Sequence, residues 1–178
     1  PIHFKDSTLL NLDNQLKMKN LIDGLKNCKK VFDSTVDGIK PEDFHRCCDQ
    51  FENTLTVVKS GDFIAGGYSD RSWKDCKEIN KTWYKESSKS FLFSLNRMKK
   101  YQAIDRVNAV YCASYLFPIF GGSLMSKQNQ KSVNSPDSVE ISQFNQRTAD
   151  SRESYFKRES SQEKVSSKSS VFRRWFVE

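Results

Sequence analysis

The segment from Thr54 to Tyr68 constrains the fold of this chain more than any other part of the sequence. Its first half, Thr54 to Ser60, is rich in β-branched residues, and Leu55 and Val57 alternate with polar neighbours, which is typical of a half-buried strand. Gly61-Asp62 is a plausible two-residue turn, so the chain from Phe63 onward is expected to return as the second strand of a hairpin. The sequence therefore predicts an antiparallel sheet around this hairpin.

More strands are expected around the hairpin. A third is predicted at 90–95, where Phe91, Phe93 and Leu95 occupy every second position. Short strands are expected at 109–112 and 118–121, and an aromatic one at 171–177. Gly66-Gly67 inside the hairpin indicates a β-bulge or a close approach of backbone, since it lacks the further residues of a phosphate-binding loop.

Two helices are predicted before the strands. The first spans 13–26, is capped by Asp13, and carries a mostly three- and four-spaced apolar stripe made of Leu16, Met18, Leu21, Ile22 and Leu25. The second is short and starts at Pro41, because proline suits the first helical position. Phe44, Cys47 and Cys48 would share one face of it. Helices followed by alternating strands indicate an α+β fold.

Length and composition limit the remaining possibilities. The chain has 178 residues, which fits one domain spanning 1–178, and its first residue is not Met, so we expect it to be a fragment of a longer chain. The longest apolar stretch, 109–120, is too short to span a bilayer, so no transmembrane helix is expected. Lys and Arg number 29 against 22 Asp and Glu, a net charge of +7 that favours acidic partners. No nucleic-acid motif occurs, so none of these partners is expected to be a nucleic acid.

Residues 123–170 are polar and serine-rich, and we expect them to form an insertion or loop within the domain. The last part of the chain, 151–178, interleaves aromatic residues with cations, which are the residue types that dominate binding hot spots. We predict that 151–170 contacts an acidic protein surface. The candidate partner-binding residues are Tyr155, Lys157, Arg158, Arg173, Arg174 and Trp175.

Six blocks of sequence, in order over roughly residues 9–122, resemble the TLDc domain, the module of the oxidation-resistance proteins. The residues that carry the resemblance are Asp37, Gly38, Phe44, His45, Cys48, Asp49, Lys59, Ser60, Gly66, Gly67, Tyr68, Trp73, Phe91 and Phe93. Ala109-Val110-Tyr111-Cys112 and Pro118 to Gly122 extend it, and Phe176-Val177-Glu178 looks like the start of the family's closing strand.

The resemblance implies two antiparallel β-sheets packed as a sandwich and flanked by short helices. Within it, Leu55, Val57, Phe91, Phe93 and Leu95 are expected to line one inter-sheet core. Members of the family are generally not established enzymes. They are linked to protection from oxidative stress, and several bind and regulate the vacuolar-type proton ATPase.

His45 lies near Cys47, Cys48 and Asp49, which invites a metal site or a Cys-His nucleophile. We favour a structural histidine whose ring pairs with a local backbone group, and we predict no catalytic, cofactor-binding or metal-binding residues. The five cysteines are an odd number without a CxxC pair, which indicates reduced thiols in an intracellular protein. Cys76, between Lys74 and Lys77, is a weaker candidate for an oxidisable thiol.

Two functions remain open at this point. The first is a non-enzymatic, cytoplasmic protein-interaction domain that regulates oxidative-stress protection or binds a proton ATPase subunit. The alternative is a structural interaction protein embedded in a large intracellular assembly, such as a ciliary or cytoskeletal lattice. The polar stretch 123–170 is the feature that favours the alternative, since a partner would be needed to hold it in place, and the basic excess also suits an acidic filament such as a microtubule.

Overall fold

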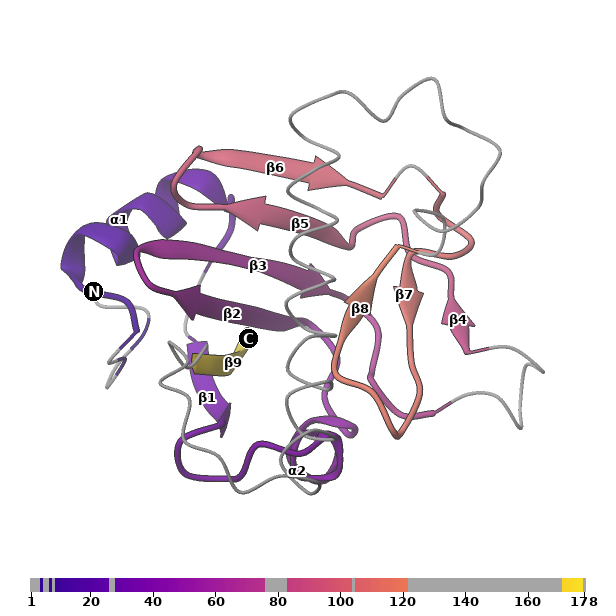
Figure 1. Ribbon diagram of the computed structural model, residues 1–178. Helices are drawn as coiled ribbons and strands as arrows, with labels where there is room; N and C mark the ends of the chain where they lie inside the picture. Colours follow the sequence, from indigo (N-terminus) through magenta and orange to yellow (C-terminus); the bar gives the residue numbers. More distant parts are fainter. Residues whose placement is uncertain are drawn as a thin grey trace.

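The computed structural model describes residues 4, 7, 9–25, 28–75, 83–103 and 105–121, together with the backbone of 171–177 and of Ser60. Two helices and nine strands make up this part of the chain, and the strands form two antiparallel sheets (Figure 1). In chain order they are α1 (Leu12–Leu21), β1 (Cys28–Asp33), α2 (Pro41–Cys48), β2 (Thr54–Ser60), β3 (Phe63–Ser69), β4 (Tyr84–Lys85), β5 (Phe91–Ser94), β6 (Lys99–Gln102), β7 (Val110–Tyr111), β8 (Ile119–Phe120) and β9 (Val171–Val177).

The larger sheet has six strands in the order β1-β9-β2-β3-β5-β6. Its centre is the predicted hairpin: Ser60 pairs with Phe63 across the turn, and Gly61 takes a positive φ of 60° there. β9, the C-terminal strand, lies between β1 and β2 and pairs with both. The predicted strand at 171–177 is therefore confirmed, and it is an inner strand of the sheet.

The smaller sheet has the order β4-β7-β8 and packs on one face of the larger one (Figure 1). Val110 and Phe120 of the smaller sheet share a buried cluster with four residues of the larger sheet, which are Phe32, Val58, Ala65 and Leu92. Phe44 and Cys48 of α2 join the same cluster. The α+β fold with two antiparallel sheets is confirmed, and this cluster is the core between the sheets.

The opposite face of the larger sheet is covered by α1 and the N-terminal segment. Leu55, Val57, Phe93 and Leu95 are buried there with Met18 and Ile22, and Phe91 packs against them partly buried. The prediction that these five strand residues share one face is right. Their assignment to the inter-sheet core is wrong, because alternation defines a face without defining which layer covers it.

The first helix is shorter than predicted. It begins at Leu12, and Asn11 rather than Asp13 is its cap: the Asn11 side chain accepts a hydrogen bond from the Asn14 amide at 2.9 Å. The helix ends at Leu21, so Leu25 lies beyond it. Of the expected stripe, Met18 is buried whereas Leu16 is 53% exposed. The second helix begins at Pro41 as predicted.

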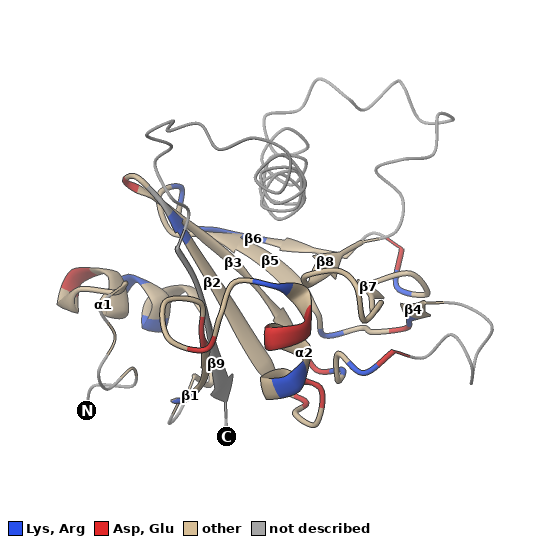
Figure 2. Cartoon of the chain, turned by 60° about the horizontal axis from the view of Figure 1, so that its bottom comes forward, with Lys and Arg blue, Asp and Glu red and all other residues tan. Residues whose placement is uncertain are grey.

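Helix α2 carries both kinds of charge, with Glu42 and Asp43 in its first turn and Arg46 in its last, whereas the edge strand β6 starts with Lys99 and Lys100 (Figure 2). Among the described residues, no helix is long and apolar enough to cross a membrane. The polar segment 123–170 lies outside the described residues, so the prediction for it stays a prediction.

Candidate functional site

The Asp37-Gly38 pair shapes the turn that leads into α2. Gly38 has a φ of +115°, and a Cβ placed on it would lie 2.1 Å from Asp43 Oδ2, so only glycine fits. Asp43 Oδ2 accepts the Lys40 amide at 3.2 Å, which satisfies a backbone donor at the start of the helix. Asp37 Oδ2 accepts the Asp33 amide at 2.6 Å. Both signature residues therefore serve to form the turn.

His45 joins α2 to the loop between β7 and β8. Its Nδ1 lies 2.6 Å from Asp49 Oδ1, one helical turn away, and its Nε2 lies 2.9 Å from the Leu116 carbonyl oxygen. The ring is only 8% exposed. The ring does pair with a backbone group, but that group lies 71 positions away, so the prediction of a local backbone partner is wrong. With both nitrogens engaged, His45 acts as a structural bridge between the two segments.

Phe44 and Trp73 are the aromatic centre of the inter-sheet core. The Phe44 ring makes edge contacts with Trp73 at 6.1 Å and with Phe32 at 5.7 Å between centroids. Trp73 also contacts Phe120 of the smaller sheet at 5.4 Å, and its indole N–H donates to Thr54 Oγ1 at 2.9 Å. Both signature aromatics are fully buried and hold α2 between the two sheets.

Gly66 and Gly67 allow aromatic rings to lie directly on β3. A Cβ on Gly66 would be 2.0 Å from the Thr56 carbonyl oxygen and 2.4 Å from Phe93 Cζ. A Cβ on Gly67 would be 2.6 Å from the ring of Phe120 on the opposite face. The strand pairing runs through both glycines without a register shift. Of the two predicted alternatives, the close approach is therefore the correct one, and the bulge is wrong.

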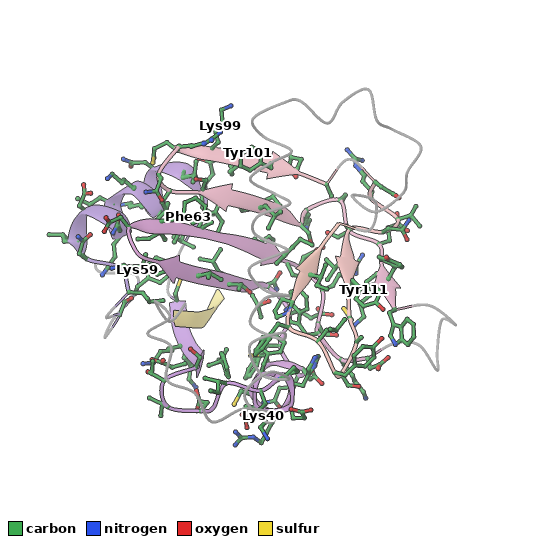
Figure 3. All side chains as sticks on the ribbon, viewed as in Figure 1. Lys40, Lys59, Phe63, Lys99, Tyr101 and Tyr111 are labelled. Atoms are coloured by element: carbon green, nitrogen blue, oxygen red, sulfur yellow. The ribbon has the colours of Figure 1, made fainter. Side chains whose placement is uncertain are left out.

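Four more signature residues, Lys59, Ser60, Tyr68 and Phe91, belong to strands β2, β3 and β5. Tyr68 stacks on Phe91 at 5.3 Å and donates its hydroxyl to Asn53 at 2.9 Å. Burial, and to a smaller extent Asp70, raises the pKa of the Tyr68 hydroxyl. Lys59 and Ser60 end β2, and Figure 3 shows Lys59 at the tip of that strand. These positions support packing and strand pairing.

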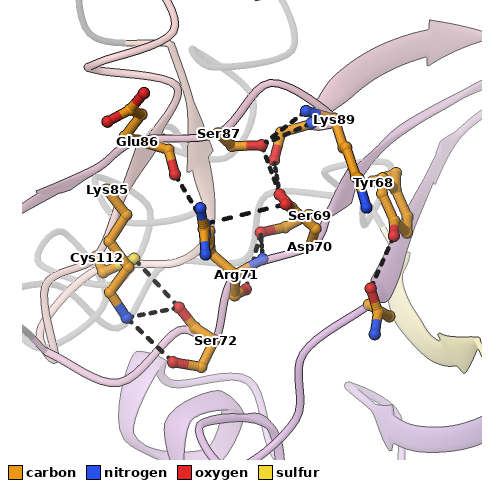
Figure 4. A network of polar contacts seen from close by, with 12 residues as sticks. Tyr68, Ser69, Asp70, Arg71, Ser72, Lys85, Glu86, Ser87, Lys89 and Cys112 are labelled. Carbon is orange, nitrogen blue, oxygen red and sulfur yellow. Dashed lines mark hydrogen bonds and ion pairs between the residues drawn. The ribbon is translucent and has the colours of Figure 1, made fainter.

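A polar network that the sequence reasoning missed ties the end of β3 to the loop before β5 (Figure 4). Asp70 Oδ1 accepts from the Ser87 hydroxyl at 2.5 Å and from the Ser90 hydroxyl at 3.1 Å. Arg71 donates to the Glu86 carbonyl at 2.8 Å. The spacing Ser87-x-x-Ser90 is the sequence signal that indicates this network. Ser87 Oγ accepts a hydrogen bond from the Ser90 amide, as in a local serine turn.

The described thiols are poorly suited to redox chemistry. Burial raises the pKa of the Cys28 thiol to about 12. Burial first, and then Asp37, raises the pKa of the Cys47 thiol as well. Cys48 and Cys112 are buried in the inter-sheet core. Since the thiolate is the reactive form, these environments disfavour oxidation. The prediction for Cys76 falls outside the described residues.

An open hollow of about 500 Å³ lies beside the histidine bridge, lined by Asp49, Gln50, Phe51, Glu52, Asn53 and Ser72. The Asp49 carboxylate is hydrogen-bonded to His45. Glu52 is the other acidic residue that lines the hollow. Within the described part of the chain, no group of three or more His, Cys, Asp or Glu side chains is arranged to hold a metal ion.

The predicted partner-binding residues divide into two sets. Tyr155, Lys157 and Arg158 lie outside the described residues. Arg173, Arg174 and Trp175 belong to β9, where their backbones pair with Val57, Thr56 and Leu55 of β2 and also with β1. This places their backbone inside the sheet, and their role in binding stays a prediction.

The signature residues with described side chains share one property: they form turns, strand contacts and the inter-sheet core. Comparison with protein families agrees with this arrangement, since the sequence matches the TLDc domain over residues 3–169. A search of curated proteins finds no match. The matched region contains both helices, the smaller sheet and every strand of the larger sheet except β9. The chain therefore belongs to the TLDc domain family.

Proposed function

We propose that this TLDc domain acts without catalysis, as a protein-interaction domain that regulates protection from oxidative stress or binds a vacuolar-type proton ATPase. Membership of the family, over residues 3–169, is the observation that carries the proposal. The family implies interaction with other proteins, and the ATPase is the partner that the resemblance suggests.

The use of the reactive side chains supports a non-enzymatic role. His45 has both ring nitrogens bonded, to Asp49 and to the Leu116 carbonyl. A general base must keep one nitrogen within reach of the proton that it removes. Cys28 and Cys47 have raised pKa values, which lowers the thiolate fraction of both. His45 and these two thiols are therefore poorly placed for catalysis.

The charge of the chain supports an acidic partner surface. The net charge is +7, and the edge strand β6 begins with the exposed Lys99, followed by Lys100, which pairs with Asp23 at 3.2 Å. The serine-rich stretch 151–170 adds further cations, including Lys157 and Arg158. Contacts between exposed charges are screened over about 10 Å at 0.1 M salt. Binding to the partner should therefore weaken as the ionic strength rises.

The test uses the full chain and the purified cytosolic sector of a vacuolar-type proton ATPase, with binding measured by interferometry at several salt concentrations. We expect binding that weakens with salt and that is reduced by deleting 157–168. A double variant, Lys157→Ala with Arg158→Ala, should reduce it too. The matched control, Lys17→Ala with Lys19→Ala on α1, removes the same charge and should bind like the unchanged chain. Absence of binding by the folded chain would refute the ATPase proposal.

The alternative function is structural, as a component of a ciliary or microtubule assembly. The excess of Lys and Arg over Asp and Glu favours it, because a basic surface suits an acidic filament. Co-sedimentation of the same chain with polymerised microtubules separates the two proposals. Binding to microtubules without binding to the ATPase sector would select the structural role, and the reverse result would reject it.

A further inference from the structure

The smaller sheet carries aromatic residues on the face turned away from the larger sheet. Tyr84 pairs with Tyr111, and Tyr111 pairs with Ile119, so these residues share one face across β4, β7 and β8. The neighbouring pair Val110 and Phe120 points the other way and is buried between the sheets. Figure 3 shows the position of Tyr111 on β7.

Two more rings extend this face into a continuous aromatic platform, which we define as Trp83, Tyr84, Tyr111 and Tyr115. Tyr84 and Tyr111 meet edge to face at 4.8 Å. Trp83 lies 5.9 Å from Tyr111 and 6.1 Å from Tyr115, again between ring centroids. Burial, followed by a hydrogen bond with the Tyr115 side chain, raises the pKa of the Tyr111 hydroxyl. The rings therefore hold one another in place.

Among the described residues, the rings of the platform are more exposed than the aromatics of the two buried clusters. Tyr115 is 47% exposed, while Trp83, Tyr84 and Tyr111 are half-buried. By contrast, Trp73 and Phe93 are each 1% exposed. Large aromatic side chains gathered at the surface are typical of interaction sites, because they bury much area at little entropic cost.

The charges beside the platform are suited to a cation. The Asp75 carboxylate accepts hydrogen bonds from the amide and the hydroxyl of Ser114, the residue before Tyr115, at 3.4 and 3.3 Å. Lys85, in β4, is turned the other way: its Nζ donates to the carbonyls of Ser72 and Lys74, each at 2.8 Å. The faces of aromatic rings are themselves electronegative and attract cations.

We propose that the aromatic platform, with Asp75 beside it, binds an arginine-bearing basic segment of a partner protein. A guanidinium group is planar and weakly hydrated, so it stacks on Tyr and Trp rings and can also pair with a carboxylate. An acidic segment would meet a carboxylate here, while the ammonium of Lys85 is directed inward. This surface is therefore separate from the acidic-partner contact of the proposed function, and it serves a partner of opposite charge.

The experiment titrates the full chain with an acetylated, amidated peptide that alternates Arg with Gly and Ser, at low ionic strength. Three matched peptides replace each Arg by Lys, by citrulline, or by Glu. We expect the Arg peptide to bind tightest, the Lys peptide more weakly, and the citrulline and Glu peptides least. Citrulline keeps the shape of the side chain and removes its charge, so it removes the cation–π attraction and the ion pair with Asp75 together.

Substitutions at Tyr115 and Asp75 locate the contact. Tyr115→Leu should lower the affinity for the Arg peptide roughly two- to thirty-fold, which is the range that cation–π interactions span. Tyr115→Phe keeps the ring and should bind like the unchanged chain, and Asp75→Asn should weaken binding in a salt-dependent manner. Val36→Ala is the control, since Val36 is 78% exposed in the turn before α2. A thermal melt checks that every variant is folded.

Several results would overturn the proposal: no binding of the Arg peptide, equal binding of the Arg and citrulline peptides, or an unchanged affinity in folded Tyr115→Leu. Binding of Tyr115→Leu to the proton ATPase sector should stay at the level of the unchanged chain. A loss there as well would show that the platform contacts that partner directly, which would contradict a separate surface for basic segments.

Discussion

Replacing Gly66 by Ala should destabilise the fold strongly. Replacing Gly67 by Ala should destabilise it less, and a second substitution that shortens a neighbouring ring should restore part of the lost stability. The difference lies in what each new methyl group would meet. At Gly66 the nearest atom is the Thr56 carbonyl oxygen at 2.0 Å, which is backbone inside the β2–β3 ladder. At Gly67 the nearest atoms belong to the end of the Phe120 ring, at 2.6 Å.

The expected magnitudes follow from these contacts. Overpacking a well-filled core costs about 1–3 kcal/mol, and more when the neighbour is unable to move. We therefore expect Gly66→Ala to lose at least about 3 kcal/mol, because Thr56 O is fixed by strand pairing. Gly67→Ala should lose about 1–3 kcal/mol, since a side chain can shift. For a chain of this size, each 1 kcal/mol corresponds to about 2–4 °C in Tm.

The assay is urea unfolding followed by circular dichroism, with each glycine variant also combined with a trimmed ring. Phe120→Leu should recover part of the stability lost by Gly67→Ala. Phe93→Leu should recover little in Gly66→Ala, because the clash with Thr56 O remains when the ring is removed. Gly66→Ala losing less than about 1 kcal/mol, or being rescued by Phe93→Leu, would refute the reasoning.

Three further predictions concern the core, the histidine bridge and a thiol. Phe93→Ala should cost about 3–5 kcal/mol in urea unfolding and Phe91→Ala clearly less, since Phe93 is 1% exposed and Phe91 only half-buried; equal losses would contradict this. His45→Ala should cost about 1–3 kcal/mol, because the Leu116 carbonyl loses its partner, and an unchanged urea midpoint would contradict the bridge. The Cys28 thiol should react slowly with iodoacetamide at pH 8 and faster as pH approaches about 12. Because folding raises its pKa from 9.0, the folded state should also lose stability as pH rises above 9, and rapid alkylation at pH 8 would argue against this burial.

Local patterns in the sequence were enough to predict the elements whose signals lie in adjacent residues. The β2–β3 hairpin follows from β-branched residues around Gly61-Asp62, and α2 follows from Pro41 with acidic residues after it. The face shared by Phe91 and Phe93 follows from alternation along β5. Each of these depends on interactions within a few residues, which a single sequence displays directly.

Strands β1, β4 and β6 escaped prediction because their sequences carry little apolar alternation. β6 is the clearest case: it reads Lys-Lys-Tyr-Gln and is mostly exposed at the edge of the sheet, so pairing with β5 defines it rather than burial. The bridge from His45 to Leu116 was likewise hidden, since its partners lie 71 positions apart. The turn Ser87-x-x-Ser90 was also hidden as part of a network, because its acceptor Asp70 lies 17 positions before Ser87.

The sequence by itself determined which residues share a face, where the central hairpin turns, and which family signature the chain carries. Only the tertiary structure decided which layer covers each face: α1 lies on Leu55 and Phe93, and the smaller sheet lies on Val58 and Leu92. It also placed β9 between β1 and β2. The physical reason is that alternation and turn chemistry act locally, whereas layer order and strand insertion depend on contacts between segments far apart in the chain.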